Sequence, residues 1–395
     1  MQQDPTTADP IPDQPPPVHR TEPAEVGTDE EVAAPDRVPG SPAVLARGDP
    51  GVAATSRNLP TDKEMVDPTL ADQNLLVVMR GVSRSFDDRR VVDEIDLTVP
   101  RGTILGIIGP SGAGKTTTIR MLTGAIPPTS GEVRVLGTEP RRFRRRDRER
   151  IGYMPQLFTL YEDLTAGENV DFVASLFGLL WRKRRRRVRE VLKVVDLWDA
   201  RKRQAGKLSG GMQRRLELAC ALVHDPALII LDEPTAGIDP LLRGSIWDEL
   251  HRLRDAGRTL LVTTQHISEA EECDSVALIV GGRIIALAPP DEVRRMATNG
   301  DLLEIETATM FDGAGLKDVA GVLEVRQDGP RHLTVVVEAA GAALPAVVER
   351  IRSSGTDVES AREVRLSFDD VFAILVKRHE DSLAAQRATT GEAAA

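Results

Sequence analysis

One short run of glycines, a lysine and a threonine has the spacing of a loop that binds polyphosphate. The run Gly-Pro-Ser-Gly-Ala-Gly-Lys-Thr occupies residues 109–116, with two glycines flanking four residues before Lys115 and Thr116. Glycines let successive backbone N–H groups curl around phosphate oxygens, and a following helix adds partial positive charge. Lys115 can reach the β- and γ-phosphates, and the Thr116 hydroxyl can ligate Mg²⁺. The run therefore predicts a nucleotide site.

The segments on either side of this loop have the character that the motif requires. Residues 103–108 read as a buried strand, and residues 116–123 read as a helix. We expect the phosphates to contact the loop and the first turn of that helix. The expected nucleotide contacts are Gly109, Pro110, Ser111, Gly112, Ala113, Gly114, Lys115, Thr116 and Thr117.

Two carboxylates follow a second apolar strand. Residues 227–231 are apolar throughout, as expected at the centre of a parallel sheet, and Asp232 and Glu233 come next. At the carboxyl end of a buried strand these side chains face the phosphate loop. Asp232 can hold Mg²⁺, and Glu233 can polarise an attacking water as a general base.

A second helix start has the features of an anion site. Ser209 has the character of a helix N-cap, and Gly210 and Gly211 expose backbone N–H groups ahead of residues 212–223. One chain thus carries two helix amino termini that can hold phosphate.

With these motifs the sequence resembles the nucleotide-binding subunit of an ABC transporter. The resemblance implies an α/β P-loop NTPase (ABC ATPase) core with an inserted helical subdomain, and it implies ATP and Mg²⁺ as cofactors. In that family two subunits form a head-to-tail dimer, in which the Leu-Ser-Gly-Gly signature of one contacts the γ-phosphate bound by the other. A homodimer of this chain would have two equivalent hydrolytic sites.

The resemblance also assigns residues that lie outside the glycine-rich runs. Gln156 matches the Q-loop residue that touches Mg²⁺ and reports the nucleotide state to the membrane subunit. Residues 236–239 match the D-loop at the dimer interface, and His266 matches the switch histidine that contacts the γ-phosphate. Phe86 aligns with the aromatic residue that stacks on adenine, where the family often has tyrosine. The predicted catalytic residues are thus Glu233, His266 and Lys115, and the predicted metal ligands are Thr116, Gln156 and Asp232.

Composition divides the chain into parts. Residues 1–74 carry 14 acidic and 5 basic side chains and 13 of the 26 prolines, which predicts a disordered tail without signal-peptide character. We expect the ABC ATPase domain at 75–298, with its helical subdomain at about 155–215. The pattern after Pro289 and Pro290 predicts a small C-terminal α+β domain at 299–378, including a strand at 363–367 and a last helix at 368–377, and a flexible end at 379–395.

The sequence contains no apolar run of the roughly 18 residues that a membrane span requires. Two cysteines, Cys220 and Cys273, predict neither a metal site nor a disulfide framework and fit a reducing cytoplasm. The resemblance therefore implies a separate multi-span permease subunit. It also implies a location on the cytoplasmic face of the cell membrane through that partner.

Two segments resemble the ABC-2 type exporters, including drug-resistance (daunorubicin-type) and multidrug ATPases. They are residues 160–169, after the Q-loop, and the Leu-Ser-Phe-Asp-Asp-Val-Phe ending at residues 366–372. The prediction is an ATP-hydrolysing subunit for efflux of a drug, lipid or other hydrophobic compound. The alternatives are an ABC importer subunit and a soluble ABC ATPase acting on ribosomes or nucleic acid.

Two basic runs, at 141–150 and 182–187, stand apart from these motifs. We expect a helical, solvated face for each, with contact to anionic lipid head groups as the functional alternative. Nucleic-acid binding is not expected, because aromatic residues, which would stack on bases, are only 3% of the chain.

Overall fold

The computed structural model describes residues 74–157 and 159–392, and for residues 241, 242 and 386–392 it describes the backbone only. The predicted acidic tail, residues 1–74, lies outside the described residues apart from Asn74. Residues 393–395, at the end of the predicted flexible segment, lie outside them as well.

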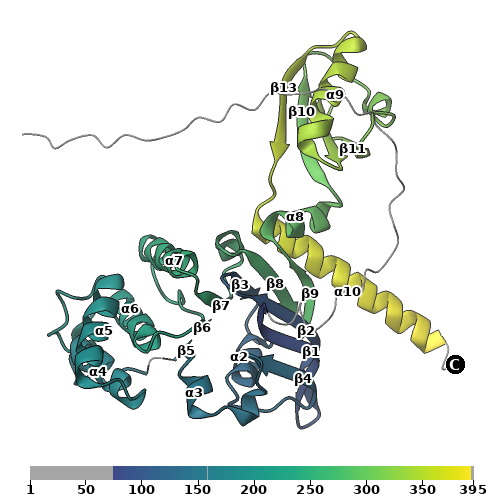
Figure 1. Ribbon diagram of the computed structural model, residues 1–395. Coiled ribbons are helices and arrows are strands. Elements are labelled where there is room, and N and C mark those ends of the chain that lie inside the picture. The colour runs from purple at the N-terminus through teal and green to yellow at the C-terminus, as the bar shows by residue number, and fades with distance from the viewer. Residues whose placement is uncertain (1–73, 158, 393–395) are drawn as a thin grey trace, which may run out of the picture. The chain divides into compact units, whose positions relative to one another are not determined.

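A six-stranded sheet forms the centre of the predicted nucleotide-binding half, residues 75–298 (Figure 1). Its strands are parallel except for the last pair, β8 and β9, which form an antiparallel hairpin. Strands β3, β6 and β7 are buried along their whole length, because helices and a second sheet cover both faces. The strand order is β5 (Ile151–Met154), β6 (Leu228–Asp232), β7 (Thr259–Thr264), β3 (Ile104–Ile108), β8 (Ser275–Val280) and β9 (Arg283–Ala288).

A smaller antiparallel sheet carries the expected adenine-stacking residue. Its order is β2 (Arg89–Pro100), β1 (Leu75–Phe86) and β4 (Ser130–Val135). Strands β1 and β2 form a hairpin in which Asp87 has a φ of 47°, as tight hairpin turns require. Phe86 is therefore the last residue of β1, directly before this turn.

Helices connect the strands. The structure has α2 (Lys115–Leu122), η1 (Pro140–Arg142), α3 (Arg145–Arg148), α4 (Ala166–Leu176), α5 (Trp181–Val194), η2 (Ala205–Lys207), α6 (Gly210–Leu222), α7 (Pro240–Asp255) and η3 (Ile267–Glu272). Thr165 and Glu168 form a capping box at the start of α4, and Ser209 caps α6. Figure 1 shows α4, α5 and α6 gathered beside β5, which is the inserted helical group that the sequence predicts.

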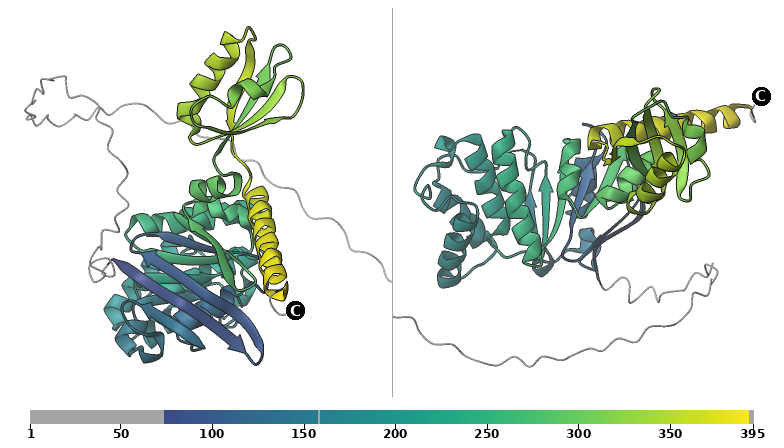
Figure 2. Two further views of the ribbon diagram at one scale, coloured as in Figure 1. Left: turned by 90° about the vertical axis from the view of Figure 1, so that its right-hand side faces the viewer. Right: turned by 90° about the horizontal axis from the view of Figure 1, so that it is seen from above.

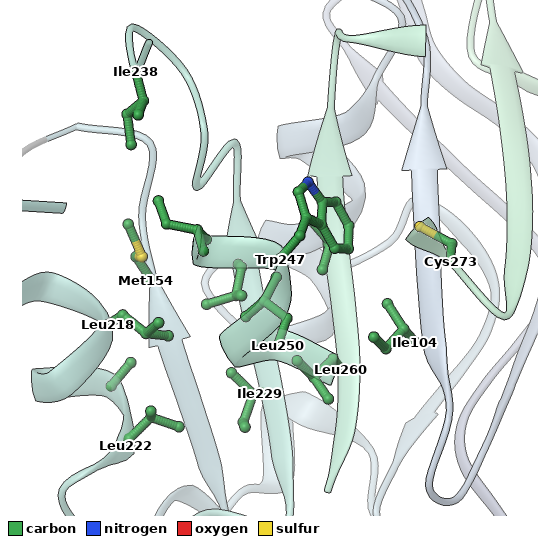
Figure 3. Close-up of a cluster of buried hydrophobic side chains, with 14 of the residues drawn as sticks. Ile104, Met154, Leu218, Leu222, Ile229, Ile238, Trp247, Leu250, Leu260 and Cys273 are labelled. Atoms are coloured by element: carbon green, nitrogen blue, oxygen red, sulfur yellow. The ribbon is translucent and has the colours of Figure 1, made fainter. Parts of the chain in front are cut away.

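One buried cluster ties the sheet to the helical group. Figure 3 shows Met154 of β5 and Ile229 of β6 facing Leu218 and Leu222 of α6, with Trp247 of α7 in the same cluster. A second buried cluster lies between the six-stranded sheet, α2 and the antiparallel sheet. The site residues at the strand ends are thus held on a packed scaffold.

Residues 301–364 form a second compact unit with its own core. Its antiparallel sheet has the order β11 (Val322–Gln327), β12 (His332–Val337), β10 (Asp301–Thr307) and β13 (Val358–Val364). Helix α9 (Ala340–Ser353) covers one face of this sheet (Figure 2), and η4 (Gly313–Leu316) packs beside it. Helix α8 (Pro290–Thr298) precedes the unit.

The structure corrects three expectations about segments. The basic run 141–150 forms only η1 and the single turn α3, because successive arginines repel one another along a helix. The strand expected at 363–367 lies earlier, at β13. The last helix, α10 (Phe368–Glu392), continues well past Lys377 and adds Phe368, Val371 and Leu375 to the core of the nucleotide-binding half.

Among residues 74–157 and 159–392, we find no helix with the length and apolar character that a bilayer crossing requires.

Candidate nucleotide site

The predicted phosphate loop joins the carboxyl end of β3 to the first turn of α2. Gly112 and Gly114 have φ angles of 79° and 106°, which side chains rarely tolerate. A Cβ on Gly109 would lie 2.2 Å from the carbonyl oxygen of Ile279, so this position also requires glycine. No side chain caps the amino terminus of α2, which leaves its first backbone N–H groups for a phosphate.

The buried ammonium group of Lys115 lies back over this loop. Its Nζ donates to the carbonyl oxygens of Gly109 at 2.8 Å and Pro110 at 3.1 Å. The same Nζ lies 3.4 Å from Oε1 of Glu233, with both side chains buried. A phosphate in the loop would therefore meet a cation that the protein has already positioned.

Asp232 ends β6 next to the loop and is fully buried. Its Oδ1 accepts hydrogen bonds from the hydroxyls of Thr263 at 2.6 Å and Thr116 at 3.4 Å. Its Oδ2 is buried without a hydrogen-bond partner in the described structure. A buried, unpaired carboxylate oxygen is costly, and Mg²⁺ prefers oxygen ligands of this kind. Asp232 and Thr116 therefore fit the expected metal.

Glu233 is held in an unusual backbone conformation, with a φ of 51°. Its N–H donates to the carbonyl oxygen and the hydroxyl of Thr263, both at 3.0 Å, which stabilises that conformation. Its Oε2 accepts from Nε2 of Gln156 at 2.9 Å. The contacts described so far thus bring Lys115, Thr116, Gln156, Asp232 and Glu233 together at the strand ends.

The loops around His266 and residues 236–239 connect to this cluster through the backbone. The Gly109 N–H donates to the Thr264 carbonyl oxygen, and the His266 N–H donates to the Thr264 hydroxyl. The Ala236 N–H donates to the Glu233 carbonyl oxygen. Both segments thus follow directly from strands that end at the site.

Two predicted contacts are not part of this cluster. Ser209 caps α6 by accepting a hydrogen bond from Met212 N at 3.4 Å. Within the described residues, no hydrogen bond or ion pair joins Ser209–Gly211 to the phosphate loop. Phe86 is exposed at the end of β1, with the Arg84 guanidinium 4.5 Å from the ring centroid on one face. An adenine base would stack on the other face or displace Arg84.

Comparison with known proteins identifies the family. The model of the ABC transporter family matches residues 92–236. The daunorubicin/doxorubicin resistance ATP-binding protein of Streptomyces peucetius is 36% identical over 320 residues, which covers 79% of this chain and 96% of that protein. This chain belongs to the ABC transporter ATPase family. The predicted fold class is confirmed.

Other members of the family match over shorter lengths. The probable multidrug ABC transporter ATP-binding protein of Escherichia coli K12 is 35% identical over 226 residues, which are 57% of this chain but only 39% of that longer protein. Among solved structures, a dimeric post-hydrolysis ATP-binding cassette bound to ADP and phosphate is 27% identical. It has a TM-score of 0.50 and covers 54% of this chain and 98% of that one.

The ABC ATPase has one well-connected site residue that the sequence did not single out. Arg214 of α6 donates from its guanidinium to the carbonyl oxygens of Gln156 at 2.8 Å, Pro155 at 3.3 Å and Glu233 at 3.4 Å. It also pairs with Glu217, one turn further along α6, at 2.8 Å. A planar guanidinium is suited to several such acceptors at once. Arg214 therefore links the signature helix to the Q-loop and to Glu233.

Glu217 extends this link to the other side of the Q-loop. Its Oε1 accepts the Thr159 N–H at 3.1 Å, while burial raises the pKa of the Glu217 carboxyl and Arg214 opposes that rise. The sequence carries one signal for this pair, namely opposite charges three residues apart after a Ser-Gly-Gly start. That signal is common on exposed helices, so it does not distinguish this buried pair.

Replacing Arg214 with glutamine is expected to lower ATP turnover about tenfold or more. The reason is that one charge-assisted hydrogen bond contributes about 1.5 kcal/mol or more, which corresponds to about a tenfold change in rate. Arg214→Lys should restore little, because an ammonium group cannot reach the three carbonyls at once. Steady-state phosphate release would measure the loss of turnover, and ATP affinity measured on the same variants would show whether binding is lost as well. The matched control is Lys193→Gln, which removes the same charge from an exposed site on α5. Equal activities for the Arg214 and Lys193 variants would contradict the role assigned to Arg214.

Proposed function

We propose that this ABC ATPase hydrolyses ATP to power an ABC-2 type exporter of a drug, lipid or other hydrophobic compound. The supporting observation is the extent of the likeness to the daunorubicin/doxorubicin resistance protein, which covers 96% of that protein's length. The match therefore reaches beyond the family model at residues 92–236. The chain would act on the cytoplasmic face of the cell membrane through a separate multi-span subunit.

In this proposal, the phosphate loop and Lys115 bind and orient the phosphates of ATP. Thr116 and Asp232 would hold Mg²⁺, with Gln156 beside them. When bound, Mg²⁺ neutralises charge on the β- and γ-phosphates. Glu233 takes the proton of the attacking water, and its fixed backbone, the buried Lys115 and Gln156 hold the carboxylate at the site. His266 completes the site at the γ-phosphate.

We further propose that two copies of the chain enclose two ATP molecules. The start of α6 is a helix amino terminus capped by Ser209 and followed by Gly210 and Gly211, which is suited to a phosphate from outside its own phosphate loop. The dimeric cassette found among solved structures supports this arrangement. Closure on ATP would move the Q-loop and α6 together, because Arg214 and Glu217 of α6 form hydrogen bonds with the Q-loop backbone.

The membrane subunit would dock beside the Q-loop. A pocket of about 320 Å³ lies there between β5 and the helical group, lined among others by Tyr153, Pro155, Val173 and Phe177. Its lining is mostly apolar and includes residues next to Gln156. A helix end or loop of the membrane subunit that entered it could therefore sense displacement of the Q-loop.

Tyr153→Ser is expected to reduce recovery of the membrane subunit about tenfold or more, as removal of an aromatic hot spot does. Basal ATPase activity should persist, because Tyr153 lies in the pocket and not among the phosphate contacts. The measurement is co-purification of tagged protein from its native membrane, followed by identification of what accompanies it. Met310→Ser, at another exposed apolar side chain, is the control.

The same co-purification tests the proposed function. A multi-span membrane protein that depends on Tyr153 supports the exporter assignment and provides material for cargo assays. Recovery of ribosomes or DNA without a membrane subunit would overturn it. Recovery with a solute-binding protein would favour the importer alternative.

A further inference from the structure

We propose that a surface formed by the two basic runs and the turn between α4 and α5 binds the anionic face of a lipid bilayer directly. This surface, here called the basic corner, comprises residues 141–150 and the turn and helix start at 176–187. The inference does not depend on the export function proposed above, because lipid alone would be the ligand.

The fold brings the first basic run beside the turn that leads into the second, although the two are far apart in the sequence. The guanidinium of Arg145 lies against Gly178, where a Cβ would come within 2.2 Å of its Nη2 atom. Phe143 and Arg148 line the same pocket as Phe177. Residues of the η1–α3 segment thus lie directly beside the turn between α4 and α5.

Three large apolar side chains are exposed within a six-residue stretch of this corner. Leu176 is 66% exposed, Leu180 is 80% exposed and Trp181 is 63% exposed. Single exposed apolar residues are ordinary, but a group of them usually marks an interaction site. Leucine and tryptophan beside basic residues are the combination that enters the boundary between lipid head groups and acyl chains.

The charge of the corner is opposite to that of the whole chain. Residues 141–150 and 182–187 together hold 13 arginines and lysines and two carboxylates, whereas the chain has a net charge of −10. Attraction to an anionic surface would therefore orient the protein with this corner toward the lipid.

Several of the cations in α5 already have structural partners. Arg184 pairs with Asp171 at 2.9 Å, and Arg187 pairs with Glu190 at 3.0 Å and also donates to backbone carbonyls at the end of α6. Arg182 and Lys183 are exposed and form no ion pair with a carboxylate of the described residues. These two are therefore available for phosphate head groups.

A lipid surface fits the corner better than a nucleic acid does. Single-stranded nucleic acid is held by base stacking on aromatic faces. Trp181 is the aromatic residue exposed among 176–187, and the Arg185 guanidinium lies 5.7 Å from its ring centroid. The other exposed apolar groups are leucines, which insert among acyl chains but do not stack on bases.

The test uses the purified full-length chain and vesicles. Sedimentation would compare phosphatidylcholine vesicles with vesicles containing about one third phosphatidylglycerol, at low and high salt. We expect binding to the anionic vesicles only, weakened by salt. The double variant Arg182→Gln/Lys183→Gln should lower the partition coefficient roughly 25-fold, about fivefold for each charge removed near the surface.

The control variant Lys317→Gln/Arg352→Gln removes the same charge from exposed sites of the C-terminal unit and should bind normally. Leu180→Ser tests the apolar contribution separately and should weaken binding several-fold without changing net charge. ATPase activity would verify that each variant folds.

Three results would overturn the inference. One is equal loss of vesicle binding in the Arg182/Lys183 and Lys317/Arg352 variants, which would indicate diffuse charge. Another is failure of the wild-type chain to bind anionic vesicles. The third is tight binding to single-stranded DNA through Arg182 and Lys183 with no vesicle binding. None of these results bears on export, because no membrane subunit is present in the assay.

Discussion

Replacing Glu233 with glutamine is expected to lower steady-state ATP hydrolysis about 100- to 10,000-fold, because an amide cannot take the proton of the attacking water. The substitution keeps the shape of the side chain. It removes the charge that faces Lys115 at 3.4 Å, and its amide can turn its oxygen toward Nε2 of Gln156. ATP binding should therefore persist while hydrolysis stops, and ATP should hold the variant in the closed dimer.

Phosphate release and oligomeric state, measured on the same preparations, check this prediction. Glu292→Gln is the matched control, since Glu292 is an exposed carboxylate in the first turn of α8. If the Glu233 variant hydrolysed ATP within about threefold of the control, Glu233 would not be the general base.

The parts of the site that follow one strand were predictable from the sequence. The loop at 109–116 and the carboxylates Asp232 and Glu233 each follow a short apolar segment, and that segment is a fully buried strand in the structure. Parallel strands with both faces covered are apolar throughout, so the sequence marks where each one ends. A side chain at the carboxyl end of such a strand is then placed by topology alone.

The parts that depend on packing between distant segments were not predictable. Arg214 is important because it donates to three backbone carbonyls of the Q-loop and Glu233. Every residue has a backbone carbonyl, so the sequence does not indicate which carbonyls will accept a side-chain hydrogen bond. The contact of Arg145 with Gly178 was equally unpredictable, because neither segment carries information about the other.

The predictions of two helix boundaries were wrong for a different reason. The run at 141–150 has arginines at spacings of three and four residues, where like charges repel, and only one helical turn forms there, with Asp147 bonded back to the Arg144 N–H. By contrast, α10 continues to Glu392 through a segment rich in alanine, the best helix former. Composition suggested fraying at that end, but helix propensity and the anchoring of Phe368 in the core favour a longer helix.

Lys115→Ala is expected to weaken ATP binding about 100-fold or more, since a charge-assisted hydrogen bond to phosphate contributes about 1.5–3 kcal/mol and Lys115 can make more than one. The measurement is the equilibrium affinity for ATP. Lys377→Ala, at an exposed lysine of α10, is the control. Unchanged affinity in the Lys115 variant would contradict the assignment of the phosphate loop.

A second variant separates two causes of this loss. Lys115 both faces the expected phosphate position and neutralises the buried carboxylate of Glu233. If affinity falls only because Glu233 is left unpaired and repels the phosphates, Lys115→Ala/Glu233→Gln should recover wild-type affinity. If Lys115 binds phosphate directly, the double variant should remain as weak as Lys115→Ala to within a few-fold. We expect the second result. In the wild-type chain, the carbonyl oxygens of Gly109 and Pro110 hold the Lys115 ammonium at the phosphate loop independently of Glu233.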